Sequence, residues 1–131
     1  MIGLDTNVVV RYIAQDDPVQ SKLATDLIEE ACSSSTPGYI SLVVLVELIW
    51  VSESCYEASR AEVAQIVRQL LRARQLVVQQ AELVWKALRH FEGSTADFAD
   101  GLVQQLALAA GCSSVVSFDK AAAKAGMVLL R

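Results

Sequence analysis

Short apolar runs alternate with helical patterns along the whole chain, and this alternation constrains the fold more than any other feature. Strands that are separated by helices pair in parallel through right-handed crossovers. The runs predicted to be strands cover residues 1–4, 39–41, 76–79, 114–118 and 127–130. The pattern therefore predicts an α/β fold with a central parallel sheet of about five short strands and helices on both faces.

The predicted helices have recognisable beginnings. Asp17 places a capping acid directly before Pro18, a residue that suits the first helical position. Ser59 and Glu62 have the spacing of a capping box. Residues 42–51 fit either a buried strand or a buried helix, and their length and their start just after a strand favour a helix. One helix is predicted just after Asp5. The others are predicted over residues 18–32, 42–51, 59–73, 80–92 and about 97–110.

Length and composition predict one ordinary folded domain over residues 1–131. The chain is 53% apolar and 20% charged, so it is neither a disordered chain nor an acidic tail. Its longest apolar stretch, residues 42–51, is too short to cross a membrane, which needs about 20 residues. Residues 1–5 contain no basic leader and already reach an acid, which predicts a cytoplasmic protein.

The chain contains three scattered cysteines, Cys32, Cys55 and Cys112. None of them forms a C-x-x-C pair, and they are too few and too far apart for a disulfide framework or a zinc site. We therefore expect all three to be small buried apolar groups.

Four acids from distant parts of the chain are candidates for a common site. Asp5 and Asp119 directly follow predicted strands, and ligands of open parallel sheets bind beyond the carboxyl ends of the strands. Glu47 lies in the helix that leaves the second strand, and Asp100 lies in the first turn of a helix that begins near Asp97. We expect these acids to meet at one rim. Without these four, 11 acidic residues remain against 11 basic ones, so the four candidate acids account for the net charge of −4.

Each acid also has a simpler structural explanation. Asp5, Asp97 and Asp119 stand where helix N-caps stand, and aspartate is a preferred cap. Glu47 is different, because it is the only charge in a strongly apolar segment that we expect to be largely buried. A buried carboxylate without a partner would cost several kcal/mol.

A cation could solve this problem, but no Lys or Arg occurs between Lys22 and Arg60. A basic partner must then come from remote sequence, and a hard divalent ion such as Mg²⁺ or Mn²⁺ is the other solution. Without a cation, clustered carboxylates repel one another, which raises the pKa of some of them.

Several reaction classes are excluded because the sequence lacks the residues or motifs that they require. His90 is the only histidine, so a nuclease with paired imidazoles cannot be assembled. The chain has no G-x-S-x-G elbow, no G-x-x-x-x-G-K-[ST] loop and no G-x-G-x-x-G turn. Metal-assisted hydrolysis of a phosphodiester remains.

Four motifs occur in the order and spacing typical of one nuclease family. They are Asp5-Thr6-Asn7, the segment 41–48, the segment 97–102 (DFADGL) and the segment 117–120 (SFDK). The chain resembles PIN-domain ribonucleases over nearly its whole length, and most closely the VapC-type toxins of bacterial toxin–antitoxin pairs. The resemblance implies an endoribonuclease, a hydrolase that depends on Mg²⁺ or Mn²⁺.

The resemblance also assigns roles to individual residues. The acids that it assigns to the metal and to catalysis are Asp5, Glu47, Asp100 and Asp119, with Asp97 as an additional acid. Asn7 and Ser117 match polar residues that arrange the metal site, as donors to the carboxylates. Gly101 departs from the family pattern, in which a small apolar residue such as Ala is usual, and it loosens a helix near the site.

Contacts with RNA and with partner proteins are predicted from basic and apolar residues. Arg68 and Arg72 share a helix face and are candidates for the RNA backbone, although such a face can also be merely solvated. Arg11 lies in the helix predicted just after Asp5, nearer to the candidate acids, and is the better candidate for a phosphate contact. The high apolar content of the chain predicts a protein interface with Trp50 as an anchor. The alternative is that the apolar side chains simply fill the core. By resemblance, the interface would serve a homodimer and a cognate antitoxin protein.

Two other classes of function remain open. One is a non-catalytic PIN-fold module that binds RNA or protein. The other is a phosphotransfer receiver domain, which is also α/β and binds a metal through carboxylates. A receiver needs an adjacent pair of acids after the first strand, whereas Asp16-Asp17 lies well beyond Asp5.

Overall fold

The computed structural model describes residues 1–131, and the chain forms two compact units, Met1–Ala81 and Glu82–Arg131. Five short strands are present, as predicted, and all their pairings are parallel. They form a three-stranded sheet and a separate two-stranded sheet, where the sequence predicted a single sheet. The α/β class is confirmed. None of the helices is long and apolar enough to pass through a bilayer.

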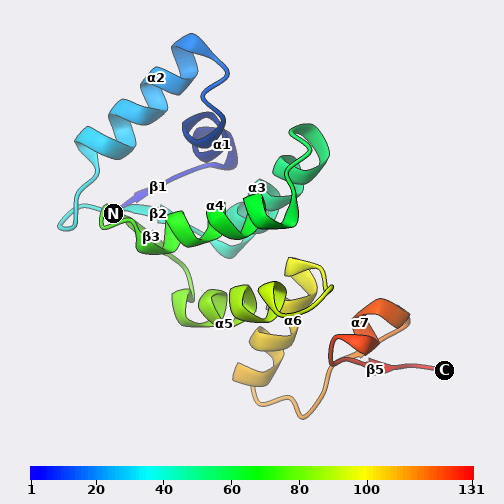
Figure 1. Cartoon of the computed structure of the whole chain (residues 1–131). Coiled ribbons are helices and arrows are strands. Elements are labelled where there is room, and N and C mark those ends of the chain that lie inside the picture. The colour runs from blue at the N-terminus through cyan, green and yellow to red at the C-terminus, as the bar shows by residue number, and fades with distance from the viewer. The chain divides into compact units, whose positions relative to one another are not determined.

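The first unit holds the three-stranded sheet and most of the helices (Figure 1). Its elements are β1 (Ile2–Gly3), α1 (Thr6–Ala14), α2 (Pro18–Asp26), the π-helical turn η1 (Leu27–Ala31), β2 (Gly38–Ile40), α3 (Leu42–Cys55), α4 (Arg60–Arg72) and β3 (Leu76–Val78). The strand order is β1-β2-β3, so β2 is central. Ile2 pairs with Gly38, and Gly38 pairs with Leu76.

Gly38 begins the central strand at a point where a side chain would crowd its neighbours. A Cβ atom at this position would lie 2.9 Å from Leu4 Cδ1, 3.1 Å from Leu76 Cδ2 and 3.3 Å from Cys32 Sγ. Side chains from both sides of the strand therefore close over the Gly38 backbone. This glycine favours close packing, because a larger residue would push the Leu4 side chain aside.

The predicted helix starts are confirmed by their hydrogen bonds. Asp17 Oδ1 accepts from the backbone N–H groups of Val19 (3.1 Å) and Gln20 (2.8 Å). Ser59 and Glu62 form the reciprocal capping box. The helix predicted over residues 18–32 is divided into α2 and the wider turn η1, because the Cys32 N–H reaches back five residues to the Leu27 carbonyl (2.8 Å).

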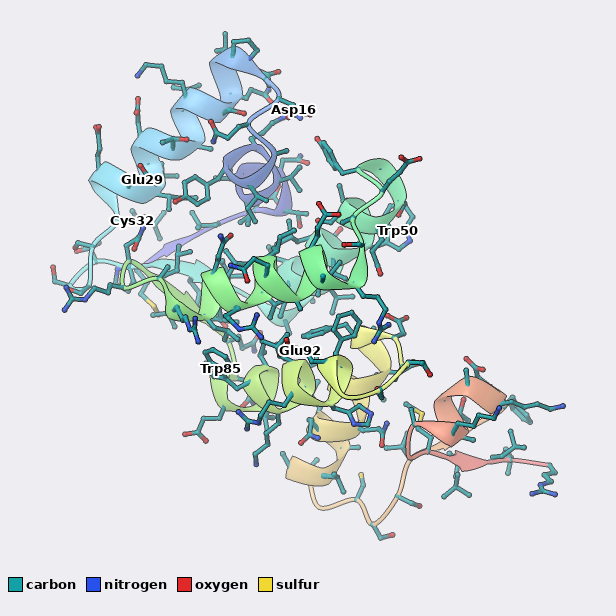
Figure 2. The ribbon with its side chains drawn as sticks, viewed as in Figure 1. Asp16, Glu29, Cys32, Trp50, Trp85 and Glu92 are labelled. Carbon is teal, nitrogen blue, oxygen red and sulfur yellow. The ribbon has the colours of Figure 1, made fainter.

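Segment 42–51 is a helix, as predicted, but the expectation that it is largely buried is wrong. Leu45, Leu48 and Ile49 on α3 are buried, whereas Val43 and Trp50 are 69% and 65% exposed. Figure 2 labels Trp50 on this helix. The reason is that α3 is apolar on all sides, so composition does not reveal which face the protein covers.

The second unit consists of a helix pair followed by a small parallel sheet. Its elements are α5 (Ala81–Glu92), which begins at the last residue of the first unit, α6 (Phe98–Ala109), β4 (Val116–Ser117), α7 (Lys120–Lys124) and β5 (Val128–Leu129). Helices α5 and α6 meet through the rings of Phe91 and Phe98, whose centroids lie 5.7 Å apart in an edge-to-face arrangement.

Gly101 lies where α6 approaches α5. A Cβ atom at this position would be 3.4 Å from His90 Cδ2, which is an ordinary contact distance. An alanine, the residue usual in the family pattern, therefore fits here.

The cysteines are only partly as predicted. Cys32 is buried, as expected, while Cys55 and Cys112 are exposed and all three are free thiols. Cys55 is the last residue of α3, and Cys112 follows the end of α6 after Gly111. Both stand at helix ends that the core does not cover, so the prediction that they are buried is wrong.

The cap of α2 can be tested by removing its acceptor. We expect Asp17→Ala to lower the free energy of unfolding by about 1 kcal/mol, because two N–H groups at the helix start lose their partner. Asp17→Asn keeps an acceptor oxygen and should differ from the parent by only a few tenths of a kcal/mol. Urea unfolding followed by circular dichroism measures both, and equal losses in the two variants would contradict the role of the cap.

Candidate functional site

In the first unit, one residue joins two of the candidate acids. Asp5 caps α1, and its Oδ1 accepts from the Thr6 N–H at 2.9 Å. The Thr6 hydroxyl in turn donates to Glu47 Oε1, also at 2.9 Å. Asp5 follows β1 and Glu47 lies in the second turn of α3, so the first unit brings these two acids to either side of Thr6.

Thr6 belongs to the motif Asp5-Thr6-Asn7, but the sequence alone assigned it no role. It is 8% exposed, one of the few buried polar residues of the chain. A signal existed, because a β-branched hydroxyl residue at a helix start between two polar neighbours, Asp5 and Asn7, is an uncommon choice for the helix itself. The partner of that hydroxyl could not be deduced without the fold.

The argument that Glu47 needs a cation because it is buried is wrong. Glu47 is exposed on α3, and its carboxylate accepts from the Thr6 hydroxyl. Water and this hydroxyl can therefore solvate the charge. Any cation at Glu47 has to be argued from the acids around it and not from the cost of burial.

In the second unit, one acid is affected by two others. Burial raises the pKa of Asp100 above its usual value, and the negative charges of Asp97 and then Asp119 raise it further. Burial and nearby like charges both disfavour the ionised form of a carboxyl. Asp97 and Asp119 therefore lie close enough to Asp100 for their charges to act on it.

The capping explanation of three acids is correct. Asp5 caps α1, Asp97 caps α6 with Oδ1 3.4 Å from the Ala99 nitrogen, and Asp119 caps α7 with Oδ1 2.9 Å from the Ala121 nitrogen. Each cap uses Oδ1 and leaves Oδ2 without a protein donor. Capping therefore fixes the direction of each carboxylate and still leaves an oxygen for a hard divalent ion. In their chemistry, these donors fit Mg²⁺ or Mn²⁺.

Neither unit by itself brings three His, Cys, Asp or Glu side chains within the reach of one metal ion. Asp5 and Glu47 belong to the first unit, while Asp97, Asp100 and Asp119 belong to the second. The structure therefore shows a pair of acids in the first unit and, separately, three acids in the second.

The two polar residues predicted to donate to the acids do something else. Ser117 Oγ accepts a hydrogen bond from the Asp119 backbone N–H at 3.0 Å, so it shapes the turn before α7. Asn7 is exposed, makes no hydrogen bond to an acid, and lines a groove along α1 and α2. In this structure neither side chain donates to a carboxylate.

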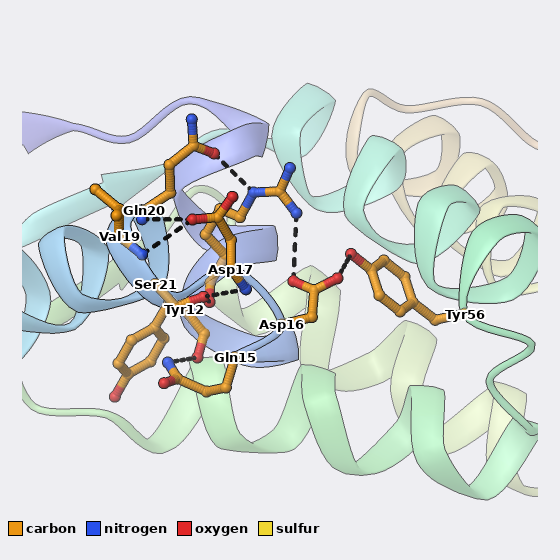
Figure 3. Close-up of polar contacts among 9 residues, drawn as sticks. Tyr12, Gln15, Asp16, Asp17, Val19, Gln20, Ser21 and Tyr56 are labelled. Carbon is orange, nitrogen blue, oxygen red and sulfur yellow. Dashed lines mark hydrogen bonds and ion pairs between the residues drawn. The ribbon is translucent and has the colours of Figure 1, made fainter.

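Arg11 is already engaged by a neighbouring acid. Its Nη1 lies 3.3 Å from Asp16 Oδ1, and its Nε donates to Gln20 Oε1 at 2.8 Å. Figure 3 labels Asp16 and Gln20 in this group of polar contacts. The Tyr56 hydroxyl donates to Asp16 Oδ2 at 2.7 Å and, with the Arg11 charge, holds the pKa of Asp16 below its usual value. Asp16 is therefore ionised at neutral pH, and a phosphate at Arg11 would have to compete with it.

The other predicted RNA contacts lie on α4. Arg68 is half-buried and Arg72 is exposed, and both have interaction partners in the structure. Arg68 is therefore not fully exposed to solvent on this face of α4. His90, the only histidine, has a buried Nε2 without a hydrogen-bond partner, which favours a structural over a solvated role.

A groove of about 480 Å³ runs between α1 and α2. Its lining is formed by Asn7, Val8, Arg11, Gln20, Leu23, Ala24 and Leu27. Leu23 is 64% exposed, so the groove combines an accessible apolar side chain with a guanidinium group.

Comparison with known families gives one clear result. The family model described as PIN domain matches residues 2–127, which is nearly the whole chain. No curated protein matches the chain.

The raised pKa of Asp100 has a consequence for stability. A carboxyl whose pKa is higher in the folded than in the unfolded state destabilises the fold once it is ionised. The cost is absent below the usual pKa of aspartate, grows as the pH rises above it, and is complete once the pH has passed the raised pKa. We therefore expect Asp100→Asn to raise the melting temperature by a few degrees at pH 7 in EDTA, with a gain that shrinks toward pH 4.

Glu57→Gln provides the matched control, because it removes one exposed acid outside the cluster. A series of melts between pH 4 and pH 7 measures the effect for both variants. A gain for Asp100→Asn that does not change with pH, or an equal gain for Glu57→Gln, would contradict the explanation by like charge and burial.

Proposed function

Because the chain belongs to the PIN-domain family, whose members are generally nucleases, we propose that it is a Mg²⁺- or Mn²⁺-dependent endoribonuclease that hydrolyses RNA phosphodiester bonds. The observation that carries this proposal is the match of the PIN-domain family model to residues 2–127, which includes the acids that cap α1, α6 and α7. In the second unit, burial raises the pKa of Asp100, and the negative charges of Asp97 and Asp119 raise it further. Arrangements that cost stability are typical of functional sites.

The residues that would hold the ion are Asp5, Glu47, Asp100 and Asp119, with Asp97 as an additional acid. The helix caps fix the carboxylates of Asp5 and Asp119, and each leaves Oδ2 available. A bound divalent ion lowers the pKa of a water molecule and neutralises charge on the phosphate. The acids of the chain would hold and orient that ion, and Asp97 would keep the local charge negative enough to attract it.

Binding of the RNA backbone would fall to the arginines, Arg11, Arg68 and Arg72. The protein carries a net charge of −4, so local positive charge must offset its repulsion of RNA. On α4, Arg68 and Arg72 lie one turn apart and can follow successive phosphates. We place the activity in the cytoplasm, where RNA is available.

We further propose that the protein is the toxin of a toxin–antitoxin pair and forms a homodimer. The groove along α1 and α2 offers Arg11 and the exposed Leu23 to a segment of a cognate antitoxin protein. Trp50, which is 65% exposed on α3, suits the centre of a protein interface. Large exposed apolar side chains of this kind favour association.

The nuclease proposal is tested by cleavage of a labelled RNA with Mn²⁺, with EDTA, and in four single variants, Asp5→Asn, Glu47→Gln, Asp100→Asn and Asp119→Asn. We expect cleavage with Mn²⁺, none with EDTA, and a loss of at least about 100-fold in each variant, because each removes one charged ligand. Gel electrophoresis of the end-labelled products measures the rates.

Asp26→Asn is the control, because Asp26 is an acid that pairs with Lys22 at 2.7 Å and lies outside the proposed site. It should cleave at the parental rate. RNA binding without metal-dependent cleavage would indicate a non-catalytic module, and phosphorylation by a small phosphodonor would indicate a receiver domain.

The basic face of α4 is tested by Arg68→Ala with Arg72→Ala. We expect RNA affinity to fall on the order of tenfold at low salt, and the slope of log affinity against log salt to decrease by roughly 1.4, since about 0.7 is lost per contact with single-stranded RNA. Filter binding over a salt series measures this. Lys86→Ala with Arg89→Ala removes two charges from α5 as a control, and an equal effect there would assign the loss to net charge alone.

A further inference from the structure

Thr6 has two hydrogen bonds, and each reaches a different proposed metal ligand. Its backbone N–H donates to Asp5 Oδ1, and its hydroxyl donates to Glu47 Oε1, both at 2.9 Å. Asp5 is adjacent in sequence, whereas Glu47 is 41 positions away on another helix. The contact with Asp5 needs only the backbone, so any residue except proline could make it. The contact with Glu47 needs a hydroxyl at this position.

The fold does not require that hydroxyl. Thr6 is the first residue of α1, and its side chain is 8% exposed. Valine has the same branched shape and would fill the same space, and both residues are mediocre helix formers. What threonine adds is one donor, and the acceptor of that donor is the carboxylate of Glu47.

Glu47 depends on this donor for its orientation. Its side chain is exposed, and the Thr6 hydroxyl is its one hydrogen-bond donor in the structure. An exposed glutamate without a partner samples several rotamers, and an ion that binds it must first select one of them. The Thr6 bond occupies Oε1 and leaves Oε2 for an ion.

We infer that Thr6 is a positioning residue of the metal site: its hydroxyl fixes the Glu47 carboxylate in the direction from which it binds the ion, while its N–H holds Asp5. This inference rests on the proposed function, because it takes Glu47 as a metal ligand. Partners that orient a ligand in this way contribute on the order of 10–100-fold to metal affinity. Thr6 itself does not touch the ion.

The test uses the full chain and Mn²⁺ alone, titrated by isothermal calorimetry without RNA. Two matched pairs isolate the hydroxyl: the parent against Thr6→Val, which replaces the hydroxyl by a methyl group, and Thr6→Ser against Thr6→Ala, which differ in the hydroxyl only. We expect the Mn²⁺ dissociation constant to rise by about tenfold or more in Thr6→Val and Thr6→Ala, and to stay within about threefold of the parent in Thr6→Ser. Melting curves in EDTA identify a variant that does not fold, and the remaining pair then decides.

The outcomes separate this inference from the proposed function. If the parent binds no Mn²⁺, the metal site itself is wrong and the role of Thr6 fails with it. If the parent binds Mn²⁺ and the variants without a hydroxyl bind it equally well, the role of Thr6 is wrong while the metal site stands. A loss in Thr6→Ser as large as that in Thr6→Ala would likewise assign the effect to packing and overturn the inference.

Discussion

The parallel pairing of β1 with β2 is the constraint on which the arrangement of the first unit depends. Ile2 pairs with Gly38 and Gly3 with Tyr39, so the two strands end at the same edge of the sheet. Helices α1 and α3 begin just beyond that edge, after the cap residues Asp5 and Ser41. Because both helices leave from one edge, Thr6 at the start of α1 can reach Glu47 in the second turn of α3. Without parallel pairing, the start of α1 would lie at the opposite end of the sheet.

Much of this arrangement could be predicted from the sequence, because it rests on local chemistry. The cap at Asp17, the box of Ser59 and Glu62, and the acids after the strands are each recognisable within a few residues. The strand positions followed from short apolar runs between helices, and the structure differs from them by only one or two residues at each end. Local rules therefore gave the elements, their order and the acids at their ends.

What could not be predicted depends on contacts between distant residues. The mostly apolar composition of α3 gave no sign that Val43, Glu47 and Trp50 would lie on its exposed side, since a helix with apolar residues on every side has no periodic pattern. The pairing of Arg11 with Asp16 and the hydrogen bond of Thr6 to Glu47 likewise need a folded backbone. The error about Glu47 and the omission of Thr6 have the same cause, because a residue's partner is not a property of its neighbours in sequence.

Capping and metal binding are often treated as competing explanations of an aspartate, yet here they support each other. A cap holds one carboxylate oxygen on a backbone N–H and directs the other away from the helix, as at Asp97 and Asp119. Asp100 has no such donor, and it is the acid on which burial and the charges of its neighbours act to raise the pKa. A cation beside Asp100 would reverse that shift, because an opposite charge favours the ionised form. In the proposed metal site, the caps would therefore supply fixed oxygens, while relief of the raised pKa of Asp100 would favour binding of the cation.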